Sequence, residues 1–425
     1  MRILNVIASM SAECGGPAQG ICNIMPHLVE AGCTVEVVCL DAPGAAIPPV
    51  PESLVIHRLG PVSNRWCFSP SLEHWLAAHL DHYDAVTVHG LWLHPSFAVW
   101  RTIKDHRYSQ RSCSDQRKTP GYWIFTHGML DPWFQKAANR RFKALRNWIY
   151  WKAIEHRVVR DAEGLLFTCE SERQLARTTF RPYRPRQEIN VGYGIEDAPM
   201  PQVSQAKAWG ERAPLIGKKP FWLFLSRVDQ KKGVDLLIRA YAKLVAELFA
   251  QSPSTEIAAT LPDLVIAGPG LDNDYGREMQ RLGASIPSGR QGPRIHFPGL
   301  LLGDVKWGAF HACEAFILPS HQENFGIAVV EALACSKPVL ISDQVNIWRE
   351  IHDDGAAFVE SDTEAGTLAL LKRLMGLSKF DKAGMGTRAR SCFERRFEAK
   401  AAARRLLEVL TDSLQTTSSG RPGPR

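Results

Sequence analysis

The chain has 425 residues, of which 45% are hydrophobic and 22% charged, with a formal net charge of +7. This composition is ordinary for a globular protein and excludes a fibrous or disordered chain, and the length exceeds one compact core, so two domains are expected. No apolar run approaches the ~20 residues that span a bilayer. The ten cysteines form no CxxC pair, which favours reduced thiols. Met1-Arg2 leads directly into an apolar run, unlike a signal peptide, so we expect a cytoplasmic protein.

The first half of the chain alternates strand-like and helix-like patterns. A helix is expected over residues 18–31, and a long helical pattern covers residues 133–159. Apolar strands are expected at residues 3–9, 34–40, 85–89, 123–126 and 165–168. Alternation of this kind predicts βαβ units and a parallel sheet. We assign residues 1–200 to an N-terminal α/β domain.

The second half repeats the alternation after a segment, residues 197–219, that is rich in Pro, Ala and Gln and reads as a linker. Helices are expected at residues 234–248 and 327–335. Strands are expected at residues 221–226, 264–267, 295–298, 315–318 and 338–342. The pattern predicts a second doubly wound parallel-sheet domain over residues 201–390. A helix over residues 391–414 follows, and the Gly/Ser/Pro-rich tail, residues 415–425, is expected to be disordered.

The most informative stretch is ILPSHQENFGIAVVEALACSKPVL, residues 317–340. A short strand ends at Pro319, a polar loop carries Glu323, Asn324 and Gly326, and the following helix carries Glu331. Open α/β sheets bind ligands at the carboxyl ends of their strands, and a helix N-terminus favours an anion. The two carboxylates suit the hydroxyl groups of a sugar, because a carboxylate accepts two hydrogen bonds from a diol.

A basic loop follows the first strand of the second domain. Arg227 and Lys232-Gly233 in LSRVDQKKGVDLLIRA lie between that strand and the next helix. An arginine fork and a lysine point charge together suit a diphosphate, although a solvated basic loop is an alternative. In the first domain, Gly15-Gly16-Pro17 follows the first strand, where glycines let the backbone approach a phosphate or sugar. A simple tight turn is the alternative there.

Two histidines of the first domain, His89 in VHGLWLHP and His127 in FTHGMLDPW, each follow a buried strand and precede a glycine. A single histidine at such a place is more often structural, but the pair indicates a ligand site, with Asp131 as a weaker candidate. The segment of residues 133–160 combines an excess of lysine and arginine with tryptophan and phenylalanine. It predicts contact with an anionic membrane surface, with an ordinary solvated helix as the alternative. No nucleic-acid recognition module accompanies these cations.

These motifs resemble a known family, the retaining GT-B glycosyltransferases called glycosyl transferases group 1, over nearly the whole chain. PSHQENFGIAVVEALACSKPVL resembles the family's element of two glutamates separated by seven residues, and SRVDQKKGVDLLIRA resembles its diphosphate motif. IAGPGLD, HFPGLL and the Gly15-Gly16-Pro17 loop follow the usual order, while VHGLW and THGMLDPW resemble a subgroup involved in cell-surface polysaccharide synthesis. The resemblance implies two Rossmann-like domains facing across a cleft, the first on the acceptor side, with the C-terminal helix packing back onto it.

The resemblance also implies residue roles. Glu331 would hold the ribose of a nucleotide sugar, and Glu323 would lie beside the donor sugar. Arg227 and Lys232 would neutralise the leaving diphosphate. The remaining implied contacts are backbone N–H groups of Asn324, Phe325 and Gly326 to sugar or phosphate, Gly15 and Gly16 over the donor, His127 near the reacting sugar, His89 at the acceptor side, and Pro298 and Leu300 near the base.

The implied reaction transfers a sugar from a nucleotide-diphosphate donor to a lipid-linked or polysaccharide acceptor with retention. No cofactor or metal is expected, because Asp272-Asn273-Asp274, which has the Asp-x-Asp spacing of a metal site, follows a glycine turn on an apparent loop. Tyr193 departs from the family, which usually has asparagine at this place. The alternatives are a non-catalytic scaffold subunit, a nucleotide-sugar epimerase, or a phosphorylase, although the sequence lacks a recognisable cofactor-lysine context for a phosphorylase.

Overall fold

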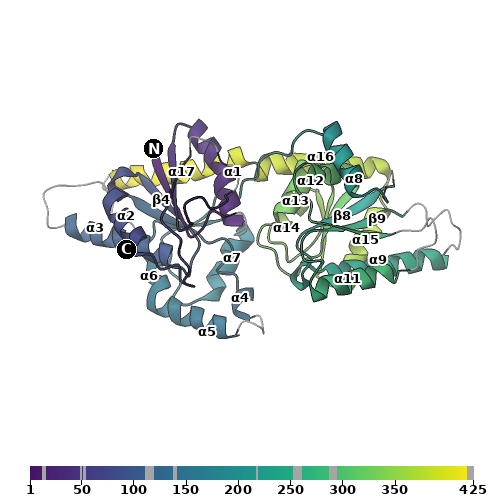
Figure 1. Cartoon of the computed structure of the whole chain (residues 1–425), viewed down its shortest axis with the longest axis horizontal. Coiled ribbons are helices and arrows are strands. Elements are labelled where there is room, and N and C mark those ends of the chain that lie inside the picture. Colours follow the sequence, from purple (N-terminus) through teal and green to yellow (C-terminus); the bar gives the residue numbers. More distant parts are fainter. Residues whose placement is uncertain are drawn as a thin grey trace. The chain divides into compact units, whose positions relative to one another are not determined.

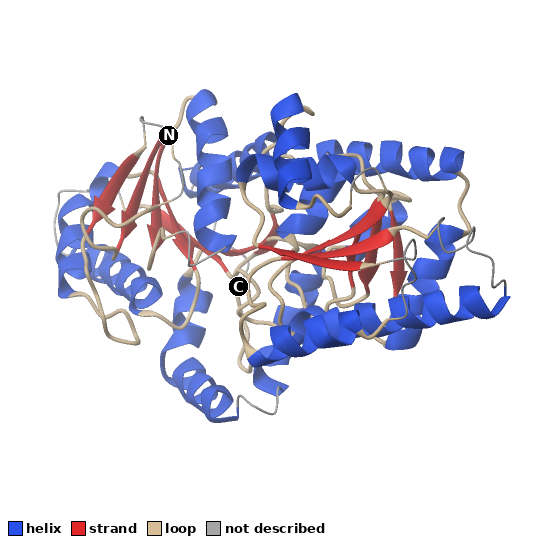
Figure 2. Cartoon of the chain, turned by 45° about the vertical axis from the view of Figure 1, so that its right-hand side comes forward, coloured by secondary structure: helices blue, strands red, loops and turns tan. Residues whose placement is uncertain are grey.

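The computed structural model describes residues 1–11, 16–47, 50, 54–110, 119–136, 141–216, 219–251, 261–286 and 294–418. The chain divides into two compact units (Figure 1). Unit 1 combines Met1–Glu196 with Ala399–Arg425, and unit 2 is Asp197–Glu398. Each unit holds one parallel sheet with helices packed on it (Figure 2).

Unit 1 contains a seven-stranded sheet in the order β3-β2-β1-β4-β5-β6-β7, and every neighbouring pair is parallel. The strands are β1 (Arg2–Ile7), β2 (Thr34–Cys39), β3 (Val55–Arg58), β4 (Ala85–His89), β5 (Gly121–Phe125), β6 (Gly164–Phe167) and β7 (Glu188–Asn190). The chain order reverses between β1 and β4, which makes that junction the switch point of this sheet.

The helices of unit 1 cover both faces of its sheet. They are α1 (Gly16–Glu30), α2 (Pro70–His79), α3 (His94–Gln110), α4 (Trp133–Lys136), α5 (Arg141–Tyr150), α6 (His156–Asp161), α7 (Glu170–Thr179) and α17 (Ala399–Ser418). On β1, Leu4 and Val6 join the core beneath α2, α3 and α6. Ile3 and Ile7 join the opposite core with α1 and α17. Side chains alternate between the faces of a strand, so this central strand is apolar on both faces.

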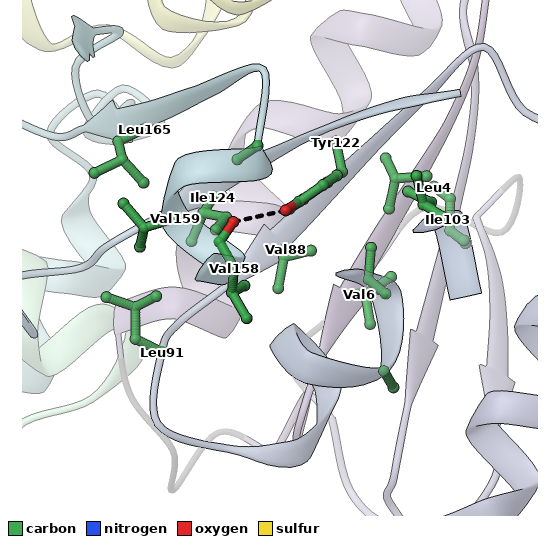
Figure 3. Packing of buried hydrophobic residues seen from close by; sticks show 14 of the residues in the cluster. Leu4, Val6, Val88, Leu91, Ile103, Tyr122, Ile124, Val158, Val159 and Leu165 are labelled. Carbon is green, nitrogen blue, oxygen red and sulfur yellow. Dashed lines mark hydrogen bonds between the residues drawn. The ribbon is translucent and has the colours of Figure 1, made fainter. Parts of the chain in front are cut away.

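The core that contains Leu4 and Val6 includes a buried hydrogen bond between β5 and α6 (Figure 3). The buried Tyr122 hydroxyl on β5 donates a hydrogen bond of 2.6 Å to the carbonyl oxygen of Val158 on α6. A buried hydroxyl needs such a partner, because leaving it unpaired would cost about 1–3 kcal/mol. The contact fixes α6 against the sheet.

The helical pattern expected over residues 133–159 is confirmed where the structure describes it, with a π-helical turn that was not predicted. The described part consists of α4, α5, a π-helical turn at Trp151–Glu155, and α6. Trp151 and Glu155 are fully buried. The π turn rotates these two side chains into the core, so only part of residues 133–160 faces outward.

Unit 2 contains a six-stranded parallel sheet in the order β10-β9-β8-β11-β12-β13. The strands are β8 (Phe221–Leu225), β9 (Asp263–Ala267), β10 (Ile295–Gly299), β11 (Ala315–Leu318), β12 (Val339–Ser342) and β13 (Ala357–Glu360). The helices are α8 (Val203–Arg212), α9 (Val234–Gln251), α11 (Asp274–Ala284), α12 (Gly303–Ala312), α13 (Ile327–Ala334), α14 (Trp348–Asp353), α15 (Glu364–Met375) and α16 (Lys379–Cys392). The order reverses between β8 and β11.

The segment expected to be a linker, residues 197–219, contains helix α8, so that prediction was wrong. α8 packs closely on α12, where a Cβ on Gly308 would lie 2.2 Å from the carbonyl oxygen of Gln205. Trp209 is buried beside Phe221, with 5.3 Å between ring centroids. The sequence pattern of α8 was missed because only one short stripe of it is apolar.

The C-terminal helix α17 belongs to unit 1, where it packs along α1. Ala402, Ala403, Leu406 and Leu410 are buried in that contact. α17 continues to Ser418, so residues 415–418 of the expected disordered tail are helical, and residues 419–425 lie outside the described part. Within the described residues, no helix is long and apolar enough to cross a membrane.

Candidate active site

The candidate site of unit 2 lies where β8 and β11 run side by side. Both strands end at the same edge of the sheet, and the loop after β8 carries Lys232 while the loop after β11 carries Glu323. Carboxyl ends of parallel strands at a switch point are the usual place for ligands in open α/β sheets. The structure therefore brings together two residues that lie 91 positions apart in the sequence.

Lys232 and Glu323 form an ion pair in which the lysine side chain is almost fully buried. The lysine sits on a 3-10 turn, Gln230–Lys232, which Asp229 caps by accepting a hydrogen bond from the Lys231 N–H group at 3.0 Å. Gly233 then adopts a left-handed conformation, φ 66°, and a Cβ there would lie 2.1 Å from the carbonyl oxygen of Pro319. Glycine is required for this close approach.

The two loops are also joined through the main chain. The carbonyl oxygen of Lys231 accepts hydrogen bonds from the His321 N–H group at 2.9 Å and from the Ser320 hydroxyl at 3.0 Å. Ser320 is fully buried. These bonds fix the loop that carries Lys232 against the loop that carries Glu323, so the positions of the two charges do not depend on their ion pair alone.

Glu331, on α13, has its own cation. Lys306 of α12 lies 2.7 Å from its carboxylate, and the Lys306 ammonium also lies 4.2 Å from the centroid of the Trp307 ring. Only 9% of Glu331 is exposed, and a buried carboxylate is stable in its charged form when it is paired in this way. The sequence interpretation missed Lys306, which lies 25 positions before Glu331 on an otherwise unremarkable helix.

The predicted backbone contacts cluster at the start of α13. Gly326 is the N-cap residue and has φ 81°. The N–H groups of Gly326, Ile327 and Ala328 donate to no other described residue, as expected for a helix N-terminus. The Asn324 side-chain oxygen accepts a hydrogen bond from Asn346 at 3.4 Å. Phe325 is buried against Phe397.

The other predicted residues of unit 2 lie around this edge. Arg227 is exposed and makes no hydrogen bond or ion pair with any described residue, so its guanidinium is available to a ligand. Pro298 lies near the end of β10, and Leu300, which is half exposed, directly follows the last residue of that strand. Gly268, after β9, needs its glycine because a Cβ would lie 1.8 Å from the carbonyl oxygen of Ser226. The carboxyl ends of β10, β9, β8 and β11 thus form one continuous rim.

Unit 1 brings together the two predicted histidines at the carboxyl ends of β4 and β5. Nδ1 of His89 lies 3.1 Å from Nε2 of His127, and Nε2 of His89 lies 3.1 Å from Oδ1 of Asn5. Burial lowers the pKa of His127 to about 4 and also lowers the pKa of His89, with the neighbouring His127 as a smaller cause. Both rings are therefore neutral near pH 7. The sequence interpretation missed Asn5, which lies inside an apolar strand.

The turn that carries His127 is held by Glu172, another residue that the sequence interpretation missed. One oxygen of this buried carboxylate accepts from the Thr126 hydroxyl and the Gly128 N–H group, both at 2.5 Å. The other accepts from the N–H group and the hydroxyl of Thr168 at 2.7 and 2.6 Å. His127 itself has φ 46°, a conformation that costs energy in a residue other than glycine and needs such support.

The glycine loop and two neighbours complete the candidate residues of unit 1. Gly15 lies outside the described residues, and Gly16 is the first residue of α1. Tyr193, the departure from the family pattern, is buried, and its hydroxyl donates a 2.5 Å hydrogen bond to the carbonyl oxygen of Gly16. Asp131 is buried and accepts from the Trp133 N–H group at the start of α4, which is a structural role.

A metal site is not evident in the described part of the chain, where no group of three or more His, Cys, Asp or Glu side chains is placed to hold an ion. In the Asp272-Asn273-Asp274 segment, Asn273 is the N-cap of α11 and accepts from the Gly276 N–H group at 2.8 Å. That segment is therefore a helix start.

Two family models match the chain. Residues 15–192 match the glycosyl transferase 4-like domain, and residues 207–382 match the domain called glycosyl transferases group 1. Among curated proteins, an uncharacterized glycosyltransferase of Methanocaldococcus jannaschii is 31% identical over 28% of this chain and 26% of its own length. The serotype-specific mannosyltransferase WbdA of Escherichia coli is 26% identical over 34% of this chain and 16% of its own length. The chain thus spans well under two thirds of these relatives.

Solved structures resemble the whole chain. Sucrose-phosphate synthase from Thermosynechococcus elongatus has a TM-score of 0.67 at 17% identity, covering 98% of this chain and 100% of its own. HepE from Anabaena, in complex with UDP and glucose, has a TM-score of 0.62 at 15% identity, covering 97% and 100%. WaaG, a glycosyltransferase involved in lipopolysaccharide biosynthesis, has a TM-score of 0.65 at 15% identity, with the same coverage. At these identities the similarity establishes the fold.

The chain is therefore composed of a glycosyl transferase 4-like domain followed by a glycosyl transferases group 1 domain, with the GT-B fold of two Rossmann-like, parallel-sheet domains.

Proposed function

We propose that the protein is a glycosyltransferase that takes a sugar from a nucleoside-diphosphate donor. The observation that carries the proposal is a pair of Lys–Glu contacts. Lys232 contacts Glu323 between the loops after β8 and β11, and Lys306 contacts Glu331 between α12 and α13. Cations paired with carboxylates suit a ligand that carries both phosphate charge and sugar hydroxyls. The match to the group 1 domain covers all four residues.

The proposed chemistry follows from charge. Negative charge develops on the leaving diphosphate in the transition state, and fixed cations stabilise it. Lys232 and the free guanidinium of Arg227 would supply that stabilisation, together with the N–H groups at the start of α13. Glu331 would accept hydrogen bonds from the ribose, and Glu323 would lie beside the transferred sugar. In this proposal the transfer proceeds with retention and without a metal.

The proposed pathway is the synthesis of a cell-surface polysaccharide, with a lipid-linked or saccharide acceptor. It is supported by the similarity to WbdA, named a serotype-specific mannosyltransferase, and to WaaG, named as involved in lipopolysaccharide biosynthesis. The complex of HepE with UDP and glucose supports a uridine nucleotide as the first donor to test.

A surface on α5 supports work at a membrane. Its exposed side chains include Phe142, Leu145, Trp148 and Ile149, and Phe142 is 92% exposed. These four fall on one side of the helix, and exposed Lys143, Arg146 and Lys152 border them. An apolar stripe flanked by cations suits an interface with anionic lipid headgroups. We propose that the protein is cytoplasmic and binds the inner face of the cell membrane through this α5 surface.

Vesicle co-sedimentation tests the α5 surface. Binding to anionic phosphatidylglycerol vesicles is expected at low salt and should weaken as salt rises. Phe142→Ser should weaken it by about tenfold or more, because burying a phenylalanine contributes roughly 1.5–3 kcal/mol. Phe380→Ser is the matched control, since Phe380 is similarly exposed, at 86%, but lies on α16. Equal losses in both variants, or no binding at low salt, would contradict the proposal.

The activity itself is tested by incubating the purified protein with a panel of nucleotide sugars and lipid-linked or oligosaccharide acceptors. Mass spectrometry should detect an acceptor enlarged by one sugar, and NMR should show the anomeric configuration of the donor preserved. An enlarged product with inverted configuration would overturn retention alone. Release of an isomerised nucleotide sugar without acceptor would indicate an epimerase. Donor binding with no turnover of any acceptor in the panel would count for a non-catalytic subunit.

A further inference from the structure

A chain of hydrogen bonds in unit 1 runs from β1 to the histidine that follows β5. Its members are Asn5, His89 and His127, joined by contacts of 3.1 Å each. Both ring nitrogens of His89 are used inside the protein, which leaves none for the substrate contact that the sequence analysis expected. The arrangement assigns His89 to a different task, the support of His127.

The hydrogen-bond donors and acceptors in this series can be assigned by starting from Asn5. The Asn5 amide nitrogen lies 3.4 Å from the main-chain carbonyl oxygen of Glu36, which can only accept. Oδ1 of Asn5 therefore points the other way, where it accepts from the Thr87 hydroxyl at 2.7 Å and from Nε2 of His89. An amide oxygen cannot donate, so Nε2 of His89 carries the hydrogen.

The remaining assignments follow in order. Both rings are partly buried, and desolvation lowers the pKa of each well enough to leave it uncharged near pH 7, so each carries one ring proton. With Nε2 protonated, Nδ1 of His89 accepts, and Nε2 of His127 must donate to it. Nδ1 of His127 then bears a lone pair, and no described residue donates to it. The adjacent Gly128 N–H group is already bound to Glu172.

We propose that Asn5 and His89 are positioning residues that lock His127 in the Nε2–H tautomer, so that its Nδ1 accepts a hydrogen bond from a sugar hydroxyl. The inference rests on the proposed glycosyl transfer for its purpose, but the tautomer is a property of unit 1 alone. In metal sites, mutating a residue that orients a histidine ligand in this way lowers metal affinity or activity about 10- to 100-fold. We expect a similar loss here.

The wild-type protein alone can overturn the tautomer assignment. Long-range proton–nitrogen NMR correlations on full-length protein labelled with ¹⁵N-histidine distinguish a protonated ring nitrogen from a bare one. His89 and His127 should each show a protonated Nε2 and a bare Nδ1 near pH 7. A protonated Nδ1 on His127 would overturn the inference, whatever the activity of the protein. This measurement needs no substrate, so its outcome is independent of the proposed function.

Two variants test the positioning role. Asn5→Leu removes the acceptor for His89, so the tautomers of both rings should mix and kcat for transfer should fall about 10- to 100-fold. Affinity for the nucleoside diphosphate should stay unchanged, since that site lies in unit 2. Thr87→Val removes the other hydrogen bond to the same Asn5 oxygen and should leave the tautomers and kcat near wild type.

Unchanged kcat in a folded Asn5→Leu protein, or equal losses in both variants, would contradict positioning. Loss of the wild-type tautomer pattern in Thr87→Val would contradict the assigned origin of the lock.

Discussion

At the scale of single residues, the candidate site is defined by how each carboxylate is paired. Glu323 and Glu331 each have a lysine of their own, and Lys232 and Glu331 are both largely removed from solvent. A buried pair contributes little net stability, but removing one member leaves an uncompensated charge. We therefore interpret the two pairs as parts of a binding site for a charged ligand rather than as sources of stability.

Lys232→Met should lower kcat for sugar transfer by about 10²–10³-fold, the usual effect of losing one group that stabilises transition-state charge. Steady-state kinetics with saturating donor measures this. Lys231→Met is the matched control, because the main-chain contacts of Lys231 survive the change of its side chain. Similar kcat values in the two variants would remove Lys232 from the proposed mechanism.

Lys306→Met should raise the donor KM by about tenfold or more while changing kcat little. Without its cation, Glu331 is a buried unpaired carboxylate that takes up a proton or turns away, and it then binds ribose poorly. Comparing the affinity for ribo- and 2′-deoxyribonucleoside diphosphates shows whether the higher donor KM arises from a lost contact with the ribose. The wild type should prefer the ribonucleotide, and the variant should lose that preference. A preserved preference would mean that Lys306 does not orient Glu331.

The residues of the site were predicted from the sequence to the extent that they stand in local motifs. Glu323, Glu331, Arg227 and Lys232 are close to a turn and a strand end, so their placement could be anticipated. Asn5, Glu172 and Lys306 could not, because each acts on a partner from 25 to 84 positions away. A polar side chain inside an apolar strand or on a plain helix has no local signature of such a partner.

At the scale of elements, the strands missed from the sequence were β3, β7 and β13, and all three lie at sheet edges. Central parallel strands are buried on both faces and form continuous apolar runs, whereas edge strands are short and partly exposed. The π-helical turn at Trp151–Glu155 was missed for a related reason. The π turn changes which side chains face the core, and that change depends on tertiary packing.

Glu155 in that turn predicts a pH effect on the stability of unit 1. Burial raises the pKa of this carboxyl to about 8, and only one of its oxygens has hydrogen-bond partners, the Trp92 N–H group and the Ser96 hydroxyl. The folded state therefore keeps a proton that the unfolded state has released above its usual pKa. Between the usual pKa of a glutamate and about pH 8, the free energy of unfolding therefore falls by about 1.4 kcal/mol for each pH unit.

Thermal unfolding of wild type and Glu155→Gln at pH 5.5 and pH 8 tests this effect. The neutral amide cannot ionise, so the variant should lose less stability than the wild type between the two pH values. The difference should be largest in signals from unit 1. Parallel pH dependence of the two proteins would show that Glu155 does not ionise in this range when the protein is folded.

At the scale of the whole molecule, the chain returns to its first unit through α17 after completing the second. The family resemblance implied a C-terminal helix that packs onto the first domain, and the structure divides the chain at Glu196 and again at Glu398. The contact that joins α17 to α1 consists of alanines and leucines at helical spacing. Such a stripe is visible in the sequence, but the surface that receives it is not.

Leu410→Ala should destabilise unit 1 and leave unit 2 unchanged. Leu410 is fully buried, and truncating a buried leucine costs about 2–5 kcal/mol. Hydrogen exchange followed by mass spectrometry should show faster exchange in β1, β2 and α1, with no change in β8, β9 and β11. Faster exchange across both units would mean that the two unfold together and that α17 does not belong to unit 1 energetically.

The central claim is that the rim of unit 2 binds a nucleoside diphosphate through Glu331 and its neighbours. Calorimetric titration of UDP and GDP into the wild type, Glu331→Ala and Glu247→Ala tests it most directly, since Glu247 pairs with Lys372 on another part of the same unit. Saturable binding of at least one nucleotide is predicted for the wild type and the Glu247 variant, with affinity at least tenfold lower for Glu331→Ala. Equal affinities in all three proteins, or no binding of either nucleotide to the wild type, would contradict the account.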